Sequence, residues 1–147
     1  VHARGEEDLV IIARTDAIAP LGLEEAIRRG HAYSEAGADV IFIEAPQSVE
    51  QLETIALEFH VPLFANMIEG GKTPFLSAHQ LENLGFKMVV YPLSGLFAAT
   101  SAIQKMAHHL MMTGSTSGFE HMVSFSQFEK VVDLDHYKEL EFQFVSK

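Results

Sequence analysis

The stretch LVIIARTDAIAP, residues 9–20, indicates the fold class of this 147-residue chain. Four apolar residues, Leu9 to Ile12, are followed after one alanine by Arg14, Thr15 and Asp16. A short apolar run bounded by polar and turn-forming residues is typical of a fully buried strand. Arg14 and Asp16 then lie at the carboxyl end of that strand, and charged residues next to a buried strand call for a structural or functional explanation.

The same unit, an apolar strand followed by a helical segment, occurs four times along the chain. We expect strands at about 9–14, 39–46, 61–67 and 87–93. Helical spacing of apolar residues follows each strand, at 22–37, 48–59, 77–85 and 95–114, and one or two shorter helices are expected within 124–144. Strands that alternate with helices predict an α/β fold with a parallel sheet covered on both faces.

Four such units fit two architectures. One is a small doubly wound sheet, and the other is half of a (β/α)8 barrel, which needs about 250 residues when complete. A half barrel would leave two unpaired strand edges and one uncovered strand face. The chain starts at Val1 without a methionine, shortly before the first strand, so we expect it to be a piece of a longer protein.

Composition excludes several classes of function. The chain has 20 acidic residues against 10 lysines and arginines, a formal charge of -10, which argues against partners such as nucleic acids and anionic membranes. It has no cysteine, and therefore no disulfide, thiol nucleophile or cysteine zinc site. No apolar run reaches the roughly 18 residues of a membrane span. We expect a cytoplasmic protein, with an organelle stroma as the alternative.

Polar side chains follow every predicted strand. Arg14 and Asp16 follow the first, Glu44 the second, Asn66 the third, and Tyr91 to Ser94 the fourth. Because the carboxyl ends of parallel strands lie at one edge of a sheet, we expect these groups to form one site. An arginine suits a carboxylate or phosphate ligand, which its planar guanidinium can hold with two hydrogen bonds.

Each of these residues also has a purely structural reading. Arg14 can pair with Asp16 or Glu44 in a structural ion pair, and Asp16 can be a turn residue. Glu44 can be a general base, a partner of Arg14 or a metal ligand through water. Asn66 can close a turn or contact a substrate oxygen. In EGGKTP, residues 69–74, the glycine pair can form a flexible loop or present backbone N–H groups to an anion.

Four motifs, IIARTDA, IFIEAP, FANMIEGGKTP and VVYPLS, together resemble strands five to eight of the isocitrate lyase and phosphoenolpyruvate mutase superfamily. The loop NMIEGGKTP and the tail from Phe125 to Phe144 are similar to its carboxyvinyl-carboxyphosphonate phosphorylmutase-like (petal death protein-like) branch. The resemblance implies that residues 1–114 form the C-terminal half of a (β/α)8 barrel and that residues 115–147 are a helical tail of the same domain.

The resemblance also implies an activity and residue roles. Members of this superfamily use Mg2+ to hold a 2-oxo carboxylate or its enolate, and they make or break a C–C or P–C bond beside it. Arg14 would hold the substrate carboxylate, and Glu44 would sit behind it as an acid, base or orienting group. The substrate would also contact a further set of residues, namely Asn66, Gly70, Gly71, Pro92 and Ser94, the last two at the pocket floor.

The chain departs from the family in one respect. The family's aspartate-rich metal strands and its cysteine-bearing catalytic loop belong to the barrel's first half. We therefore expect most Mg2+ ligands, and a missing N-terminal half, outside this chain, which alone would be inactive. The family forms dimers of dimers that exchange the eighth helix, here 95–114. The alternative is a non-catalytic half barrel that serves oligomerisation or binds small carboxylates.

Overall fold

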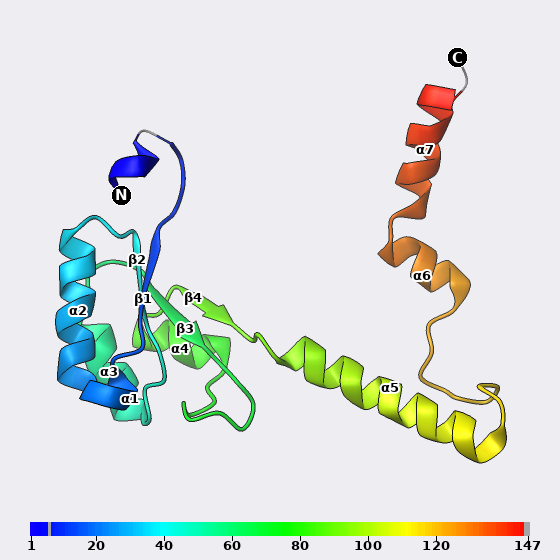
Figure 1. The fold of residues 1–147 in the computed structure, drawn as a ribbon, viewed down its shortest axis with the longest axis horizontal. Coiled ribbons are helices and arrows are strands. Elements are labelled where there is room, and N and C mark those ends of the chain that lie inside the picture. Colours follow the sequence, from blue (N-terminus) through cyan, green and yellow to red (C-terminus); the bar gives the residue numbers. More distant parts are fainter. Residues whose placement is uncertain (6, 146–147) are drawn as a thin grey trace. The chain divides into compact units, whose positions relative to one another are not determined.

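The structure is a computed structural model that describes residues 1–5 and 7–145 of the chain. Within it the backbone forms two compact units, Val1–Ala98 and Ala99–Lys147. The first unit holds all four strands, and its elements determine where the polar strand ends lie (Figure 1).

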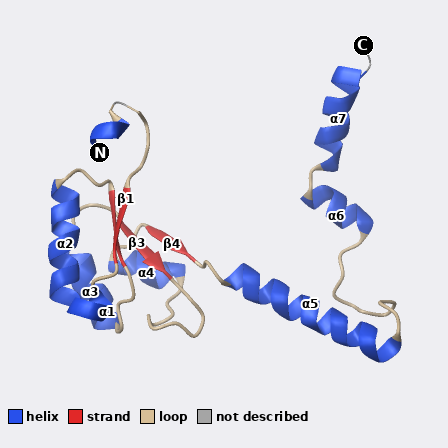
Figure 2. Ribbon diagram, viewed as in Figure 1, coloured by secondary structure: helices blue, strands red, loops and turns tan. Residues whose placement is uncertain are grey.

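The first unit is built on a four-stranded parallel sheet (Figure 2). Its strands are β1 (Ile12–Thr15), β2 (Val40–Ile43), β3 (Leu63–Asn66) and β4 (Met88–Val90). They follow one another in the order β1-β2-β3-β4, with β1 and β4 at the edges. A doubly wound sheet reverses direction at a switch point, whereas a barrel adds each strand beside the last. The strand order therefore identifies this sheet as half of a barrel and not as a doubly wound sheet.

Helices cover one face of this sheet. They are α1 (Ile18–Leu21), α2 (Leu23–Glu35), α3 (Val49–Glu58) and α4 (Ala78–Leu84), after a short 3-10 helix η1 (His2–Arg4) (Figure 1). In the core, strand residues that point toward the helices pack against apolar helix residues. Its most buried members include Ile41, Leu63, Ala26, Leu52, Ile55 and Leu81. These side chains are 2% exposed or less, and their removal from water is the main force that holds the unit together.

The opposite face of the sheet is uncovered, as predicted for half of a barrel, whereas the strand and helix pattern by itself predicted a sheet covered on both faces. Ile12, Met88 and Val90 point to this face and remain 41%, 40% and 38% exposed, among the described residues. The reason is the direction of winding. Crossovers between parallel strands are right-handed, so a sheet that always advances the same way places every helix on the same face.

Local signals in the sequence set the helix ends as predicted. Ser48 Oγ accepts a hydrogen bond from Gln51 N at 3.2 Å, and Ser77 forms a reciprocal capping box with Gln80. Gly85 ends α4 in the left-handed conformation with φ 110. The strands are shorter than predicted, with three or four residues each. Helix α1, around Pro20, was not predicted.

The second unit is helical. Helix α5 (Ser94–Thr113) begins in the first unit and continues into the second, where α6 (Phe125–Val131) and α7 (Leu134–Val145) follow. Ser124 and Gln127 form a capping box at the start of α6. These helices confirm the predicted segments 95–114 and 124–144. None of their described residues is buried, and no described helix is long and apolar enough to cross a membrane.

Candidate functional site

The carboxyl ends of the strands bring three predicted residues together. Arg14 lies in β1, Glu44 directly follows β2, and Asn66 is the last residue of β3. The backbone ladder continues just past the strands, since Glu44 N donates to Thr15 O at 3.0 Å. Neighbouring parallel strands are about 4.8 Å apart, so side chains at their shared edge are within reach of one another.

Glu44 is the centre of this group. Its Oε2 atom lies 3.4 Å from Arg14 Nη2 and accepts a hydrogen bond from Asn66 Nδ2 at 3.5 Å. The Glu44 side chain is 21% exposed, which keeps its carboxylate beside the sheet and still open to a ligand. The arrangement places a cation, a carboxylate and an amide in contact at one edge of the sheet.

The Arg14 guanidinium is held on several sides. Its Nε donates to Asp16 Oδ1 at 2.8 Å, and its central carbon lies 4.8 Å from the centre of the Phe42 ring. The hydrogen bond to Asp16 raises the pKa of Arg14, so the group stays charged. A guanidinium carries five N–H donors, so Asp16 and Glu44 leave capacity for a ligand carboxylate or phosphate.

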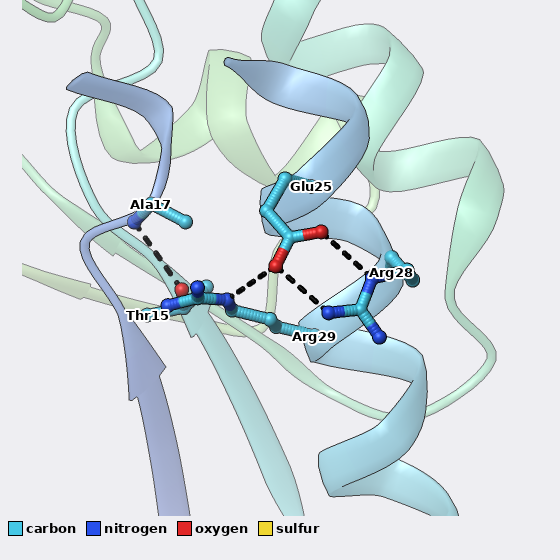
Figure 3. Close-up of polar contacts among 5 residues, drawn as sticks. All are labelled: Thr15, Ala17, Glu25, Arg28 and Arg29. Carbon is cyan, nitrogen blue, oxygen red and sulfur yellow. Dashed lines mark hydrogen bonds and ion pairs between the residues drawn. The ribbon is translucent and has the colours of Figure 1, made fainter. Parts of the chain in front are cut away.

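Thr15, between these two charged residues, has a different role. Strand alternation turns its side chain to the opposite, helix-covered face, where it is 3% exposed. Its Oγ1 accepts a hydrogen bond from Ala17 N at 3.3 Å and supports the start of α1. Figure 3 shows this bond from Ala17 to Thr15 and, on α2, the cluster in which Glu25 accepts hydrogen bonds from Arg28 and Arg29. Thr15 is therefore structural, and the site uses its neighbours.

Asn66 carries an unsatisfied polar atom. Its Oδ1 is buried and has no hydrogen-bond partner among the described residues. The amide orientation follows from Glu44, because turning the amide around would place two acceptors against each other. Buried polar atoms are nearly always hydrogen-bonded, so an orphaned carbonyl at a strand end marks a place for a donor from water or ligand.

A pocket of about 290 Å³ opens beside Glu44 and Asn66. Its other lining residues are Ala45, Ile68, Gly71, Lys72 and Thr73. The volume suits a small organic acid rather than a nucleotide. Lys72 adds a positive charge to the lining that contains the Glu44 carboxylate, so the pocket can accept an anion that also donates a proton or a hydrogen bond.

The two predicted glycines have separate roles in the wall of this pocket. Gly70 adopts φ 71, the left-handed region that favours glycine, and Gly71 N donates to Ile68 O at 3.0 Å to close a tight turn. A Cβ on Gly71 would lie 3.0 Å from that same oxygen and 3.2 Å from Ile68 Cβ. Only Gly71 lines the pocket, while Gly70 makes the turn.

The last two predicted site residues follow β4. Ser94 Oγ donates a hydrogen bond to the Glu69 carboxylate, and this bond lowers the pKa of Glu69. Pro92 is exposed and is not among the residues that line the pocket beside Glu44 and Asn66. The described structure therefore joins Ser94 to the glycine loop rather than to Arg14, Glu44 and Asn66.

Sequence reasoning missed several pocket residues. Ile68 and Thr73 line the pocket on either side of the glycine pair, and their position near it was the available signal. Ala45 has φ 59, an uncommon conformation for a residue other than glycine, and it lines the pocket between Glu44 and Pro46. Its place before a proline gave no hint, because that context favours extended backbone.

The site of this chain does not fit a complete metal centre. Among residues 1–5 and 7–145, no group of three or more histidine, aspartate or glutamate side chains could hold an ion. The two carboxylates at the strand ends, Asp16 and Glu44, both contact Arg14. That positive charge opposes a second cation at the same oxygens.

Comparison with known proteins identifies the relatives of this chain. A family model described as phosphoenolpyruvate phosphomutase matches residues 1–111. The petal death protein of Dianthus caryophyllus is 38% identical over 144 residues, which cover 97% of this chain and 45% of that protein. Such identity over nearly the whole chain, together with the family model, extends well beyond a shared short motif.

Solved structures agree with the fold. The crystal structure of 2,3-dimethylmalate lyase, a PEP mutase/isocitrate lyase superfamily member, superposes with a TM-score of 0.85 at 32% identity, covering 92% of this chain and 48% of that one. Phosphonopyruvate hydrolase in complex with oxalate and Mg++ superposes at 0.80 with 26% identity, covering 98% and 52%. The chain spans about half the length of the relatives it matches.

Proposed function

This chain belongs to the phosphoenolpyruvate phosphomutase family, within the PEP mutase/isocitrate lyase superfamily, and from that premise we propose that it forms the carboxylate-binding half of an active site. The complete enzyme would be a lyase or mutase that makes or breaks a C–C or P–C bond beside a small 2-oxo or 2-hydroxy carboxylate. The observation that carries this proposal is the contact of Arg14 and Asn66 with one oxygen of Glu44.

Arg14 binds the substrate carboxylate. Its guanidinium is already oriented by Asp16 and by the Phe42 ring, so little conformational entropy is lost when the ligand arrives. The planar fork matches a carboxylate with two parallel hydrogen bonds, which also fixes the orientation of the carbon that reacts. Phosphonates present similar oxygens, in line with a family that includes phosphomutases.

Glu44 and Asn66 act on the atoms next to that carboxylate. In a retro-aldol cleavage, the 2-hydroxyl proton leaves, the C2–C3 bond breaks, and its electron pair becomes an enolate on the departing fragment. In this proposal Glu44 accepts that proton or holds Arg14 and Asn66 in place. The second N–H of the Asn66 amide can stabilise the negative charge that develops on oxygen.

The Mg2+ ion belongs, in this proposal, to the part of the enzyme that this chain does not span. A relative of the family was crystallised with oxalate and Mg++, whereas the described residues of this chain do not offer a complete set of ligands. Glu44 would reach such an ion only through a water molecule.

We also propose two partners for this chain, the missing half of the barrel and further copies of the same protein. The open edges β1 and β4 and the uncovered sheet face fit the missing half of the barrel. The exposed apolar residues of α5, such as Leu96, Ile103 and Met111, fit exchange of this helix in a homo-oligomer built from dimers. A monomer in light scattering at micromolar concentration, with the product of the complete coding region, would contradict the oligomer.

The test of function uses the product of the complete coding region. Lyase and mutase activity is measured with Mg2+ on 2,3-dimethylmalate, oxaloacetate and phosphonopyruvate. Arg14→Lys keeps the charge but loses the fork, so kcat/KM should fall by an amount worth about 2–4 kcal/mol. Arg28→Lys, at an exposed ion pair of α2, is the matched control.

Two outcomes would reject the proposal. Equal kcat/KM for Arg14→Lys and Arg28→Lys would remove Arg14 from the substrate site. No activity on any of the three acids, combined with a coding region that ends at this half barrel, would favour the non-catalytic module that oligomerises or binds small carboxylates.

A further inference from the structure

We infer that Glu69 is a positioning residue, and that Ser94 acts through it: the Ser94 hydroxyl and the Glu69 carboxylate clamp the glycine turn that forms one wall of the pocket. This inference rests on the proposed function for its kinetic consequences. It assigns Ser94 a different role from the direct substrate contact that the sequence predicts.

The turn itself is the first part of the argument. Glu69 occupies its second position, between Ile68 and Gly70, and Gly71 N closes it on Ile68 O at 3.0 Å. Gly70 supplies the positive φ of 71 that the third position requires. Since Gly71 directly follows and lines the pocket, whatever holds the corner at Glu69 also holds the pocket wall.

Other contacts hold the two ends of the loop that contains the glycine turn, so the bond between Ser94 and Glu69 holds only its middle. Met67 is 1% exposed, and its backbone N donates to Val90 O at 2.9 Å. At the far end of the loop, the rings of Phe75 and Tyr91 lie 5.8 Å apart. Between these anchors, the bond from Ser94 to Glu69 is the one side-chain hydrogen bond seen from the exposed turn to the β4 side, within the described residues.

The hydrogen bond from Ser94 to Glu69 argues against a direct contact between Ser94 and the substrate. A serine hydroxyl has one hydrogen, and here Ser94 gives it to Glu69. An ionised carboxylate beside Ser94 also repels a second carboxylate. A substrate carboxylate would have to displace Glu69 before Ser94 could donate to it, whereas Arg14 and Lys72 are cations available on the same rim.

The consequence is a specific kinetic signature. Without the clamp, the segment Gly71–Thr73 would sample more conformations in the unliganded protein, and the substrate must order it on binding. This cost falls on binding rather than on bond cleavage, so KM should rise while kcat changes little. The same loosening should be visible without any substrate, because the Gly71 amide closes the turn.

The experiment compares Glu69→Ala, Ser94→Ala, the double variant and Glu69→Gln in the product of the complete coding region. Hydrogen exchange of the Gly71 amide is measured without substrate, and KM and kcat are measured with the preferred acid. Glu53→Ala, an exposed carboxylate of α3 away from the loop, is the matched control.

We expect Glu69→Ala and Ser94→Ala each to speed Gly71 exchange at least threefold and to raise KM five- to twentyfold. The double variant should add little to either single change, because both remove one bond. Glu69→Gln retains an acceptor and should stay within twofold of the unchanged protein, as should Glu53→Ala.

Unchanged Gly71 exchange in Glu69→Ala would overturn the clamp, and so would a Ser94→Ala defect in KM that clearly exceeds and adds to that of Glu69→Ala. The exchange measurement needs no catalysis, so it separates the two proposals. An inactive protein with faster Gly71 exchange in both single variants would reject the proposed function and retain the clamp.

Discussion

Arg14 and Asn66, on the first and third strands of the sheet, contact the same carboxylate oxygen, Glu44 Oε2, at 3.4 and 3.5 Å. The carboxylate therefore sets the orientation of both neighbours. Asp16 holds Arg14 from the other side at 2.8 Å. A rim built this way is ordered before a ligand arrives, which is the property that binding and transition-state stabilisation both require.

Asn66→Ala should reduce kcat/KM by an amount worth about 1–3 kcal/mol, because it removes one amide donor and leaves the Glu44 carboxylate with one partner fewer. Steady-state kinetics on the preferred acid measures the loss. Asn83→Ala, on the exposed face of α4, is the control and should be unchanged. Equal kinetics for both variants would exclude Asn66 from the site.

Gly71→Ala should raise KM with little change in stability. The new Cβ would lie 3.0 Å from Ile68 O, so the turn must open at the pocket wall. Gly70→Ala is the useful comparison, since nothing lies within 4 Å of its Cβ and its cost is backbone strain at φ 71. We expect that strain to cost about 1 kcal/mol of unfolding free energy. A larger KM effect at Gly70 than at Gly71 would contradict the assignment of the wall.

Gly30→Ala should destabilise the fold although alanine is the better helix former. The Cβ would lie 2.5 Å from Phe59 Cζ and 3.3 Å from Ile41 Cγ2, both in the core. Overpacking of this kind costs about 1–3 kcal/mol, against a gain of about 1 kcal/mol in helix propensity. Urea denaturation measures the net loss. Combining the change with Phe59→Leu should recover part of it, and an additive loss would count against this steric explanation.

Glu25 should titrate far below an ordinary glutamate. Hydrogen bonds from Arg28, and then from Arg29, lower the pKa of Glu25 from 4.5 to about 2. A pKa lowered in the folded state means that the stabilisation is present above pH 4.5 and is lost as the pH falls toward 2. NMR titration of the side-chain carboxyl groups measures this pKa directly.

Much of the first unit follows from the residues alone. Apolar runs followed by helical spacing predict the four βα units, and Ser48, Ser77 and Gly85 set helix ends through local hydrogen bonds and backbone conformation. Polar residues behind the strands predict one shared rim, because parallel strands end at the same edge. Their roles toward a substrate stay predictions until the variants above are measured.

The sequence by itself determined the local elements, since a cap, a turn or an amphipathic stripe depends on residues a few positions apart. Only the tertiary structure decided the strand order that distinguishes a half barrel from a doubly wound sheet, and the single face that the helices cover. It alone joined Ser94 to Glu69 rather than to the Arg14 rim, because hydrogen bonds between distant residues depend on where backbone geometry places each loop. A pattern along the chain carries no information on which of two nearby acceptors a hydroxyl meets.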